Sequence, residues 1–260
     1  MRAPWPGLLL FFVFTLPSSL LPAAGGAPDS FSLPDTLWLA RTFDTARPDS
    51  AFSEWKPLAF GGDRGETSFG ADSVLGRSCL RARARAGGSG LLRPLELDPD
   101  SIFRIRWSWW VEGPVPGGDL TRKEGDDFAA RVYVNFRFDP SRAGPLHRLK
   151  QRLASRRFGG EAPGKALVYV WGNQAPIGTV AFSAYTDQAA VLVLRSGSEG
   201  AGIWWMEERD VIADFRNAFG EEPPNLHSVA IMTDADDTGA SADACYGDIL
   251  ILPPPSGPSP

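Results

Sequence analysis

The strongest constraint on the fold is a two-residue alternation of apolar and polar side chains in the middle of the chain. In SIFRIRWSWWVEG (101–113), apolar residues at every second position alternate with Arg104, Arg106 and a serine. FAARVYVNFRF (128–138) and SCLRARARAGG (78–88) repeat the pattern. Because successive side chains of a strand point to opposite faces, these segments predict β-strands with one apolar and one polar face.

Other apolar runs, separated by Gly, Pro and Asp turns, extend the strand pattern. They cover residues 166–172, 190–196, 202–210, 227–234 and 246–252. Regular strands with few helices favour an all-β fold, an antiparallel β-sandwich that we expect to be a jelly roll. Two segments predict short helices: RDVIADFRNAFG, ended by Gly220, and a basic insertion at 142–157 with leucines at helical spacing.

The two ends of the chain differ from its middle. Residues 1–27 combine Arg2, an apolar stretch and small residues, the pattern of a secretory signal peptide, and the apolar stretch is too short to span a membrane. We therefore expect an exported protein, periplasmic or extracellular, without a transmembrane span after signal removal. Residues 28–252 predict a single sandwich domain, and the Pro-rich tail 253–260 predicts disorder.

The chain has two cysteines, Cys79 and Cys245. In an exported chain such a pair can form one long-range disulfide, and the spacing matches no zinc motif. The alternative is two separate buried thiols. The sequence leaves both open.

An acidic loop, TDADDTGASADA (233–244), joins two of the predicted strands. Asp234, Asp236 and Thr238 occupy alternate positions before a glycine, which suits the oxygen ligands of calcium, and Asp126 and Asp127 could complete the site from another loop. Counted from Asp234, the twelfth position is Cys245 rather than a glutamate, so the loop is not an EF-hand. Two alternatives stay open: aspartates that cap turns through backbone N–H groups, and a loop that contacts a sugar.

The polar faces of the predicted strands carry many arginines and some aromatic residues. Guanidinium groups bind carboxylate or phosphate, and exposed rings offer stacking surfaces, so a glycan or anionic envelope polymer is the expected ligand. With a net charge of −5, nothing indicates nucleic acid. The expected binding residues are Arg104, Arg106, Trp110, Arg131, Tyr133, Asn135 and Trp205.

Two other function classes stay open beside a non-catalytic binding module. A hydrolase or lyase acting on polysaccharide needs two convergent carboxyl groups, for example Glu207 with Asp248 or residues of the two Asp-rich loops. An envelope structural or interaction protein needs neither, but exposes an apolar patch. With two histidines and no G-x-S-x-G motif, the sequence does not favour a nucleophilic triad.

Several blocks together resemble a known family. KEGDDFAARVYVNF, ALVYVWG and the block from WWMEERDVIADFRNAFGEEPP to YGDI resemble the bacterial domain of unknown function 3047 family, over roughly residues 43–251. The resemblance implies an exported jelly-roll sandwich like the carbohydrate-binding modules, and it implies no activity. Cys245 stands where the resemblance leads us to expect a larger apolar residue.

Overall fold

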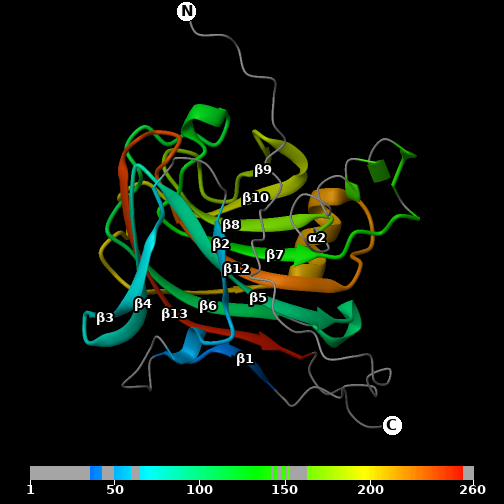
Figure 1. Cartoon of the computed structure of the whole chain (residues 1–260), viewed down its shortest axis with the longest axis horizontal. Coiled ribbons are helices and arrows are strands. Elements are labelled where there is room, and N and C mark those ends of the chain that lie inside the picture. The colour runs from blue at the N-terminus through cyan, green and yellow to red at the C-terminus, as the bar shows by residue number, and fades with distance from the viewer. Residues whose placement is uncertain are drawn as a thin grey trace, which may run out of the picture.

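The computed structural model describes residues 36–42, 50–59, 65–102, 104–141, 143–145, 148–149, 151–152 and 163–253. Two β-sheets lie face to face, with helix α2 at one side (Figure 1). The predicted all-β sandwich of jelly-roll type is confirmed. The predicted signal peptide 1–27 and most of the tail 253–260 lie outside the described residues.

Sheet A has six strands, five of them in the order β11-β6-β13-β4-β3, and β1 also pairs with β13. Their bounds are β1 Leu37–Ala40, β3 Ser68–Val74, β4 Arg77–Arg85, β6 Arg104–Val111, β11 Trp205–Arg209 and β13 Ser241–Leu252. The long β13 pairs with β4 over its first half and with β1 over its second half. The last strand in sequence, β13, therefore lies between β4 and β6, and no local sequence pattern predicts this order.

Sheet B has seven strands in the order β2-β5-β12-β7-β8-β10-β9. Their bounds are β2 Lys56–Ala59, β5 Gly88–Leu97, β7 Arg131–Phe136, β8 Ala166–Gly172, β9 Val180–Ser183, β10 Thr186–Ser196 and β12 Leu226–Asp234. The sheet departs from the expected antiparallel pairing in one place, because β10 pairs with β8 in parallel. Sheet B is therefore mixed.

The space between the sheets is filled by the apolar half of the alternation. Trp107 and Trp109 of β6 are fully buried and contact Tyr169 and Trp171 of β8, with ring centroids 5.2 and 6.3 Å apart. Tyr246 of β13 crosses the interior, and its hydroxyl accepts the backbone N–H of Arg131 on β7. These contacts bury one face of sheet A against sheet B, so the opposite face of sheet A points outward.

Helix α2, Val211–Phe219, has the ends that its sequence predicts. Asp210 accepts the N–H of Ala213 at the N-cap, and Gly220 ends the helix in the left-handed conformation, with φ of 69°. Val211 and Phe215 are buried against the core. The described residues also form three single-turn 3-10 helices: η1 Ser50–Phe52, η2 Pro99–Ser101 and η3 Lys123–Gly125.

The basic insertion at 142–157 falls largely outside the described residues. In its described part the N–H of Arg148 bonds to the carbonyl of Gly144, the spacing of an α-helical turn, and Leu149 is exposed. No helix in the described ranges is both long and apolar enough to cross a membrane.

Candidate functional site

The outer face of sheet A carries the candidate site, because its side chains come into rows across four strands. Trp38 of β1 pairs with Leu250 of β13, which pairs with Arg106 of β6, which pairs with Glu208 of β11. Neighbouring strands lie about 4.8 Å apart, so this row spans roughly 14 Å. The row places an aromatic ring at one end and charged groups at the other.

A shallow groove of about 780 Å³ runs over this face. Its lining residues are Thr36, Trp38, Arg77, Arg106, Ser108, Trp204, Met206, Asp248, Leu250 and Leu252. Trp38 is 42% exposed, a high value for so large an apolar side chain, and the Arg41 guanidinium lies 5.1 Å from its ring centroid. The groove thus combines two indole rings with hydrogen-bonding groups.

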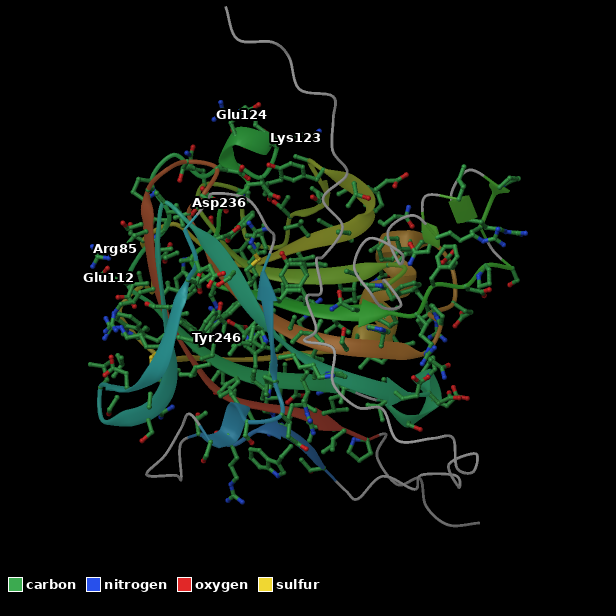
Figure 2. The ribbon with its side chains drawn as sticks, in the orientation of Figure 1. Arg85, Glu112, Lys123, Glu124, Asp236 and Tyr246 are labelled. Carbon is green, nitrogen blue, oxygen red and sulfur yellow. A yellow bond between two sulfur atoms is a disulfide. The ribbon has the colours of Figure 1, made fainter. Side chains whose placement is uncertain are left out.

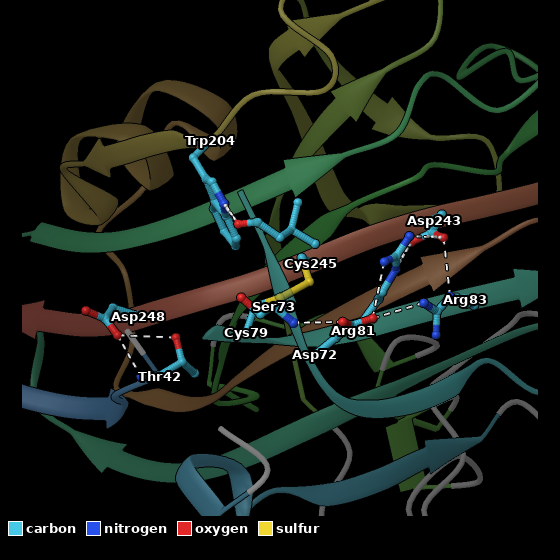
Figure 3. Close-up of a disulfide and its surroundings, with 11 residues drawn as sticks. Thr42, Asp72, Ser73, Cys79, Arg81, Arg83, Trp204, Asp243, Cys245 and Asp248 are labelled. Carbon is cyan, nitrogen blue, oxygen red and sulfur yellow. Dashed lines mark hydrogen bonds and ion pairs between the residues drawn. A yellow bond between two sulfur atoms is a disulfide. The ribbon is translucent and has the colours of Figure 1, made fainter. Parts of the chain in front are cut away.

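Trp204 is held in place from two sides. Its indole N–H donates to the carbonyl of Val74, at 2.9 Å, and its side chain packs on the cluster of Cys79, Cys245 and Trp110 (Figure 3). The two cysteines form a disulfide that joins β4 to β13 on this outer face, with Cα atoms 5.7 Å apart. One end of the groove therefore has a rigid, apolar base.

Two arginines of β6 share a single carboxylate beside the groove. Arg104 and Arg106 both donate to Glu208, Arg106 through Nε at 2.7 Å. The hydrogen bonds from these two guanidinium groups lower the pKa of Glu208. Across the groove, one oxygen of Asp248 accepts the backbone N–H and the hydroxyl of Thr42 (Figure 3).

The arginines of β4 on the same face are interleaved with acids. Arg81 donates to Asp243 and Asp72, and Arg83 forms ion pairs with the same two aspartates (Figure 3). The two carboxylates come from β3 and β13, which flank β4. This pairing is how neighbouring guanidinium groups avoid mutual repulsion, and the sequence alone did not place the acids.

Three predicted binding residues on β7 are not on an exposed face. Arg131, Tyr133 and Asn135 are all buried, because the second face of sheet B is covered as well. Tyr133 belongs to an apolar cluster there, and the Asn135 amide donates to the Ser228 hydroxyl. The prediction that these residues share a binding surface with Arg104 and Arg106 is wrong.

Trp110 lies on the predicted face of sheet A but is covered there, and Trp205 does not point outward as predicted. Trp110 is buried over the disulfide, with the Arg81 guanidinium 5.6 Å from its ring centroid. Trp205 packs against the central core, and the Arg195 guanidinium lies 3.5 Å from its ring centroid. Of the consecutive tryptophans, it is Trp204 that lines the groove.

A second cluster, which we call the Asp clasp, consists of Asp126, Asp127, Asp234, Asp236 and Arg131. The Arg131 guanidinium donates to both oxygens of Asp234 and lies 3.5 Å from Asp126, and all three side chains are buried. Asp127 accepts the backbone N–H groups of Asp237 and Thr238. Asp236 lies at the end of the sandwich that carries Lys123 and Glu124 (Figure 2).

The Asp clasp brings together three of the five predicted calcium ligands. One carboxylate oxygen each from Asp127, Asp234 and Asp236 lie within 4.8 Å of one another. Asp126 instead pairs with Arg131, and burial raises its pKa. The hydroxyl of Thr238 accepts the N–H of Ala240. The turn-capping alternative is thus present in Asp127, while calcium binding stays a prediction.

The carboxylate pair named for a hydrolase does not converge. Glu207 points into the sandwich, where it accepts from the Trp109 indole and from Arg195, whereas Asp248 lies on the outer face. Sheet A separates the two groups. The pairing of Glu207 with Asp248 is therefore wrong.

Sequence reasoning missed the groove residues Trp38, Arg77 and Trp204. Trp38 stands in LWLA, a four-residue strand too short for its alternation to be read, although its apolar neighbours Leu37 and Leu39 carry the signal. Arg77 follows a β-hairpin turn, and Trp204 precedes its strand. The groove forms only when β1 and β11 join the same sheet.

The fold and the groove define a two-sheet β-sandwich with a shallow aromatic groove on one outer face. The chain belongs to the family described as "Protein of unknown function (DUF3047)", which matches residues 53–250. No curated protein matches the sequence.

Solved structures resemble this chain only distantly. The family 11 carbohydrate-binding module of the cellulase Lic26A-Cel5E of Clostridium thermocellum has 12% identity and a TM-score of 0.43, over 88% of this chain and all of that one. The family 30 module of another cellulase of that organism has 12% identity and a TM-score of 0.40, over 84% and 98%. The K1 adhesin domain of Lys-gingipain from Porphyromonas gingivalis has 12% identity and a TM-score of 0.36, over 85% and 99%. At these scores the likeness carries no argument about a ligand.

Proposed function

We propose that this protein is a non-catalytic binding module for a glycan, and that its site is the groove on the outer face of sheet A. The observation that carries the proposal is the exposed ring of Trp38, in one groove with Trp204 and with the polar groups of Arg77, Arg106, Ser108 and Asp248. A sugar ring has an apolar face and a rim of hydroxyl groups. Indole rings suit the first and charged side chains suit the second.

The carboxyl groups of the groove support binding rather than hydrolysis. Glycoside cleavage uses two carboxyl groups about 5 to 9.5 Å apart on either side of the bond. Among the described residues that line the groove, Asp248 supplies the one carboxylate, and Thr42 already occupies one of its oxygens. The Glu208 carboxylate beside the groove is bonded to Arg104 and Arg106, so a polysaccharide hydrolase or lyase at this groove would need another carboxyl group.

Two features support a location outside the cytoplasm. Residues 1–27 have the pattern of a signal peptide. The Cys79–Cys245 disulfide suits an oxidising compartment such as the periplasm or the cell exterior. The proposed ligand is accordingly a glycan of the cell envelope or the surroundings.

Affinity electrophoresis tests the proposal. The mature protein is run through gels that contain soluble polysaccharides, one neutral and one uronic-acid polymer among them, and retardation reports binding. Trp38→Ala should weaken the retained complex by about tenfold or more, because an aromatic side chain that stacks on the ligand supplies a large share of the binding energy.

Phe182→Ala is the matched control, since Phe182 is exposed to a similar degree but lies on β9 of the other sheet. It should leave retardation unchanged. Equal retardation of wild type and Trp38→Ala on every polymer that binds would sink the groove as the site.

A further inference from the structure

The groove has an apolar rim that a soluble sugar chain would leave uncovered. The rim consists of Leu75, Ile203 and Met206, whose side chains are 68%, 48% and 66% exposed. Together with Trp38 they are four of the eight large apolar residues that are exposed in the described part of the chain. Such clustering marks an interaction surface rather than chance exposure.

One hydrogen bond assembles the rim. The indole N–H of Trp204 donates to the carbonyl of Val74 and joins the start of β11 to the β3–β4 hairpin. Leu75 follows Val74 in the chain, and Ile203 precedes Trp204, so the two exposed side chains flank this bond. Met206 lies two residues further on and lines the groove itself.

The hairpin turn indicates that Leu75, one of the three rim residues, does not serve folding. Leu75 adopts a φ of +52° at the first turn position, where Gly, Asn or Asp is the usual residue. A leucine here costs backbone energy and gains nothing from burial. A bound apolar group that covers the side chain would compensate for both.

Charged groups lie directly beside the rim. Arg77 begins β4 two residues after Leu75, and Arg106 lies in the same groove as Met206. Guanidinium groups complement a carboxylate or a phosphate. The surface thus presents, side by side, rings for a sugar, cations for an anionic substituent and an apolar edge.

We propose that the groove binds an anionic glycolipid, with the sugar on Trp38, the anionic group at Arg77 and Arg106, and an alkyl or acyl chain across the rim. This inference rests on the proposed glycan-binding function and names its ligand class. It distinguishes this groove from one that accepts a free polysaccharide chain.

Three synthetic probes separate the parts of the ligand: methyl glucuronide, octyl glucuronide and octyl glucoside, each titrated calorimetrically at concentrations where it stays monomeric. Each buried methylene strengthens binding about fourfold, so burial of three gives roughly a sixtyfold gain of octyl over methyl glucuronide. Octyl glucoside lacks the carboxylate and should bind at least about tenfold more weakly than octyl glucuronide.

The double variant Leu75→Asn with Ile203→Asn replaces two of the three rim residues, and asparagine at position 75 tolerates the positive φ of the turn. It should lose the gain from the octyl chain and keep the affinity for methyl glucuronide. Ile177→Asn with Val180→Asn is the matched control, since Val180 begins β9 and Ile177 lies in the turn before it, both exposed and on the other sheet's side of the molecule. The control should bind as wild type does.

Equal affinity for methyl and octyl glucuronide would overturn the inference, while Trp38-dependent retention on polysaccharide would leave the glycan-binding proposal standing. A wild-type dimer in sedimentation that the Leu75→Asn with Ile203→Asn variant converts to monomer would also overturn it, because the rim would then cover a second copy. Loss of Trp38 dependence on polysaccharide, by contrast, would end the parent proposal.

Discussion

Two regions of this molecule use arginine in opposite ways. On the outer face of sheet A, the Arg106 side chain is 36% exposed and shares the Glu208 carboxylate with Arg104. In the Asp clasp, the Arg131 side chain is 6% exposed and lies between Asp234 and Asp126. The same alternation in sequence thus produces a solvated ion pair in one sheet and a buried one in the other.

The difference in burial sets what each arrangement can do. A solvated ion pair contributes about 0–1 kcal/mol, so a ligand can displace it at little cost. Removal of one partner from a buried pair costs about 3–5 kcal/mol, since the other charge stays in a poorly solvated place. The outer face is therefore suited to ligand exchange, and the Asp clasp to holding the ends of β7 and β12 together.

The largest expected effect on stability concerns the buried ion pairs of Arg131. Arg131→Met leaves Asp234 and Asp126 without their cation, so we expect a loss of about 4 kcal/mol, or about 10 °C in the unfolding midpoint. Arg106→Met, the matched change on the outer face, should cost less than about 1 kcal/mol. Thermal unfolding followed by circular dichroism measures both.

Similar losses in the two variants would show that burial does not separate the two regions. The test also bears on ligand binding: Arg106→Met should weaken retention on an anionic polysaccharide while the fold is kept. Arg131 cannot be used for that purpose, because its removal disturbs the fold itself.

The sequence predicts the strands well because the alternation is a local property. The apolar half of 104–111 and of 131–136 is buried between the sheets as expected, and the α2 ends follow from Asp210 and Gly220. The alternation does not predict whether the polar side chains of a strand are exposed to solvent. In β6 they meet solvent at Arg104 and Arg106, whereas in β7 a second layer of side chains covers them.

The candidate site was harder to predict because it depends on which strands become neighbours. Trp38 and Trp204 are far apart in the chain and share a groove only through β13 and β6. The Asp clasp was easier, since two acidic loops beside predicted strands could meet, and three of the five residues do. The residue types of each loop could therefore be interpreted from the sequence, whereas the pairing of distant strands could not.

The next largest effect concerns the one rigid part of the outer face. The disulfide links residues 166 positions apart, so Cys79→Ala with Cys245→Ala should cost about 3 kcal/mol, or about 8 °C in the midpoint. Reduction of the wild type with dithiothreitol should give a similar fall and leave the variant unaffected. A variant as stable as the oxidised wild type would mean that this face needs no covalent support.

Calcium provides a smaller test, now at the Asp clasp. If Asp127, Asp234 and Asp236 bind calcium with a dissociation constant of about 1 mM, as extracellular modules do, 10 mM calcium adds about 1.4 kcal/mol and raises the midpoint by about 4 °C. Asp236→Asn should abolish the rise, and magnesium should not reproduce it. An unchanged midpoint would leave turn capping by Asp127 as the full account of the loop.

The smallest expected effect on stability concerns the solvated ion pair of Glu208 on the outer face of sheet A. Glu208→Gln should cost about 0.5 kcal/mol at pH 7, or about 2 °C, because the pair is solvated. Arg104 and Arg106 lower the pKa of Glu208 in the folded state, so its contribution is complete above the unfolded value of about 4.3 and is lost as pH falls through the lowered folded value. Melting curves of wild type and variant should therefore converge in acid, and also in 1 M salt, where the Debye length is about 3 Å. A loss of stability as large as that of Arg131→Met would mean that Glu208 orders the outer face before any ligand arrives. The ion pair on the outer face would then not be exchangeable, and the contrast with the Asp clasp would fail.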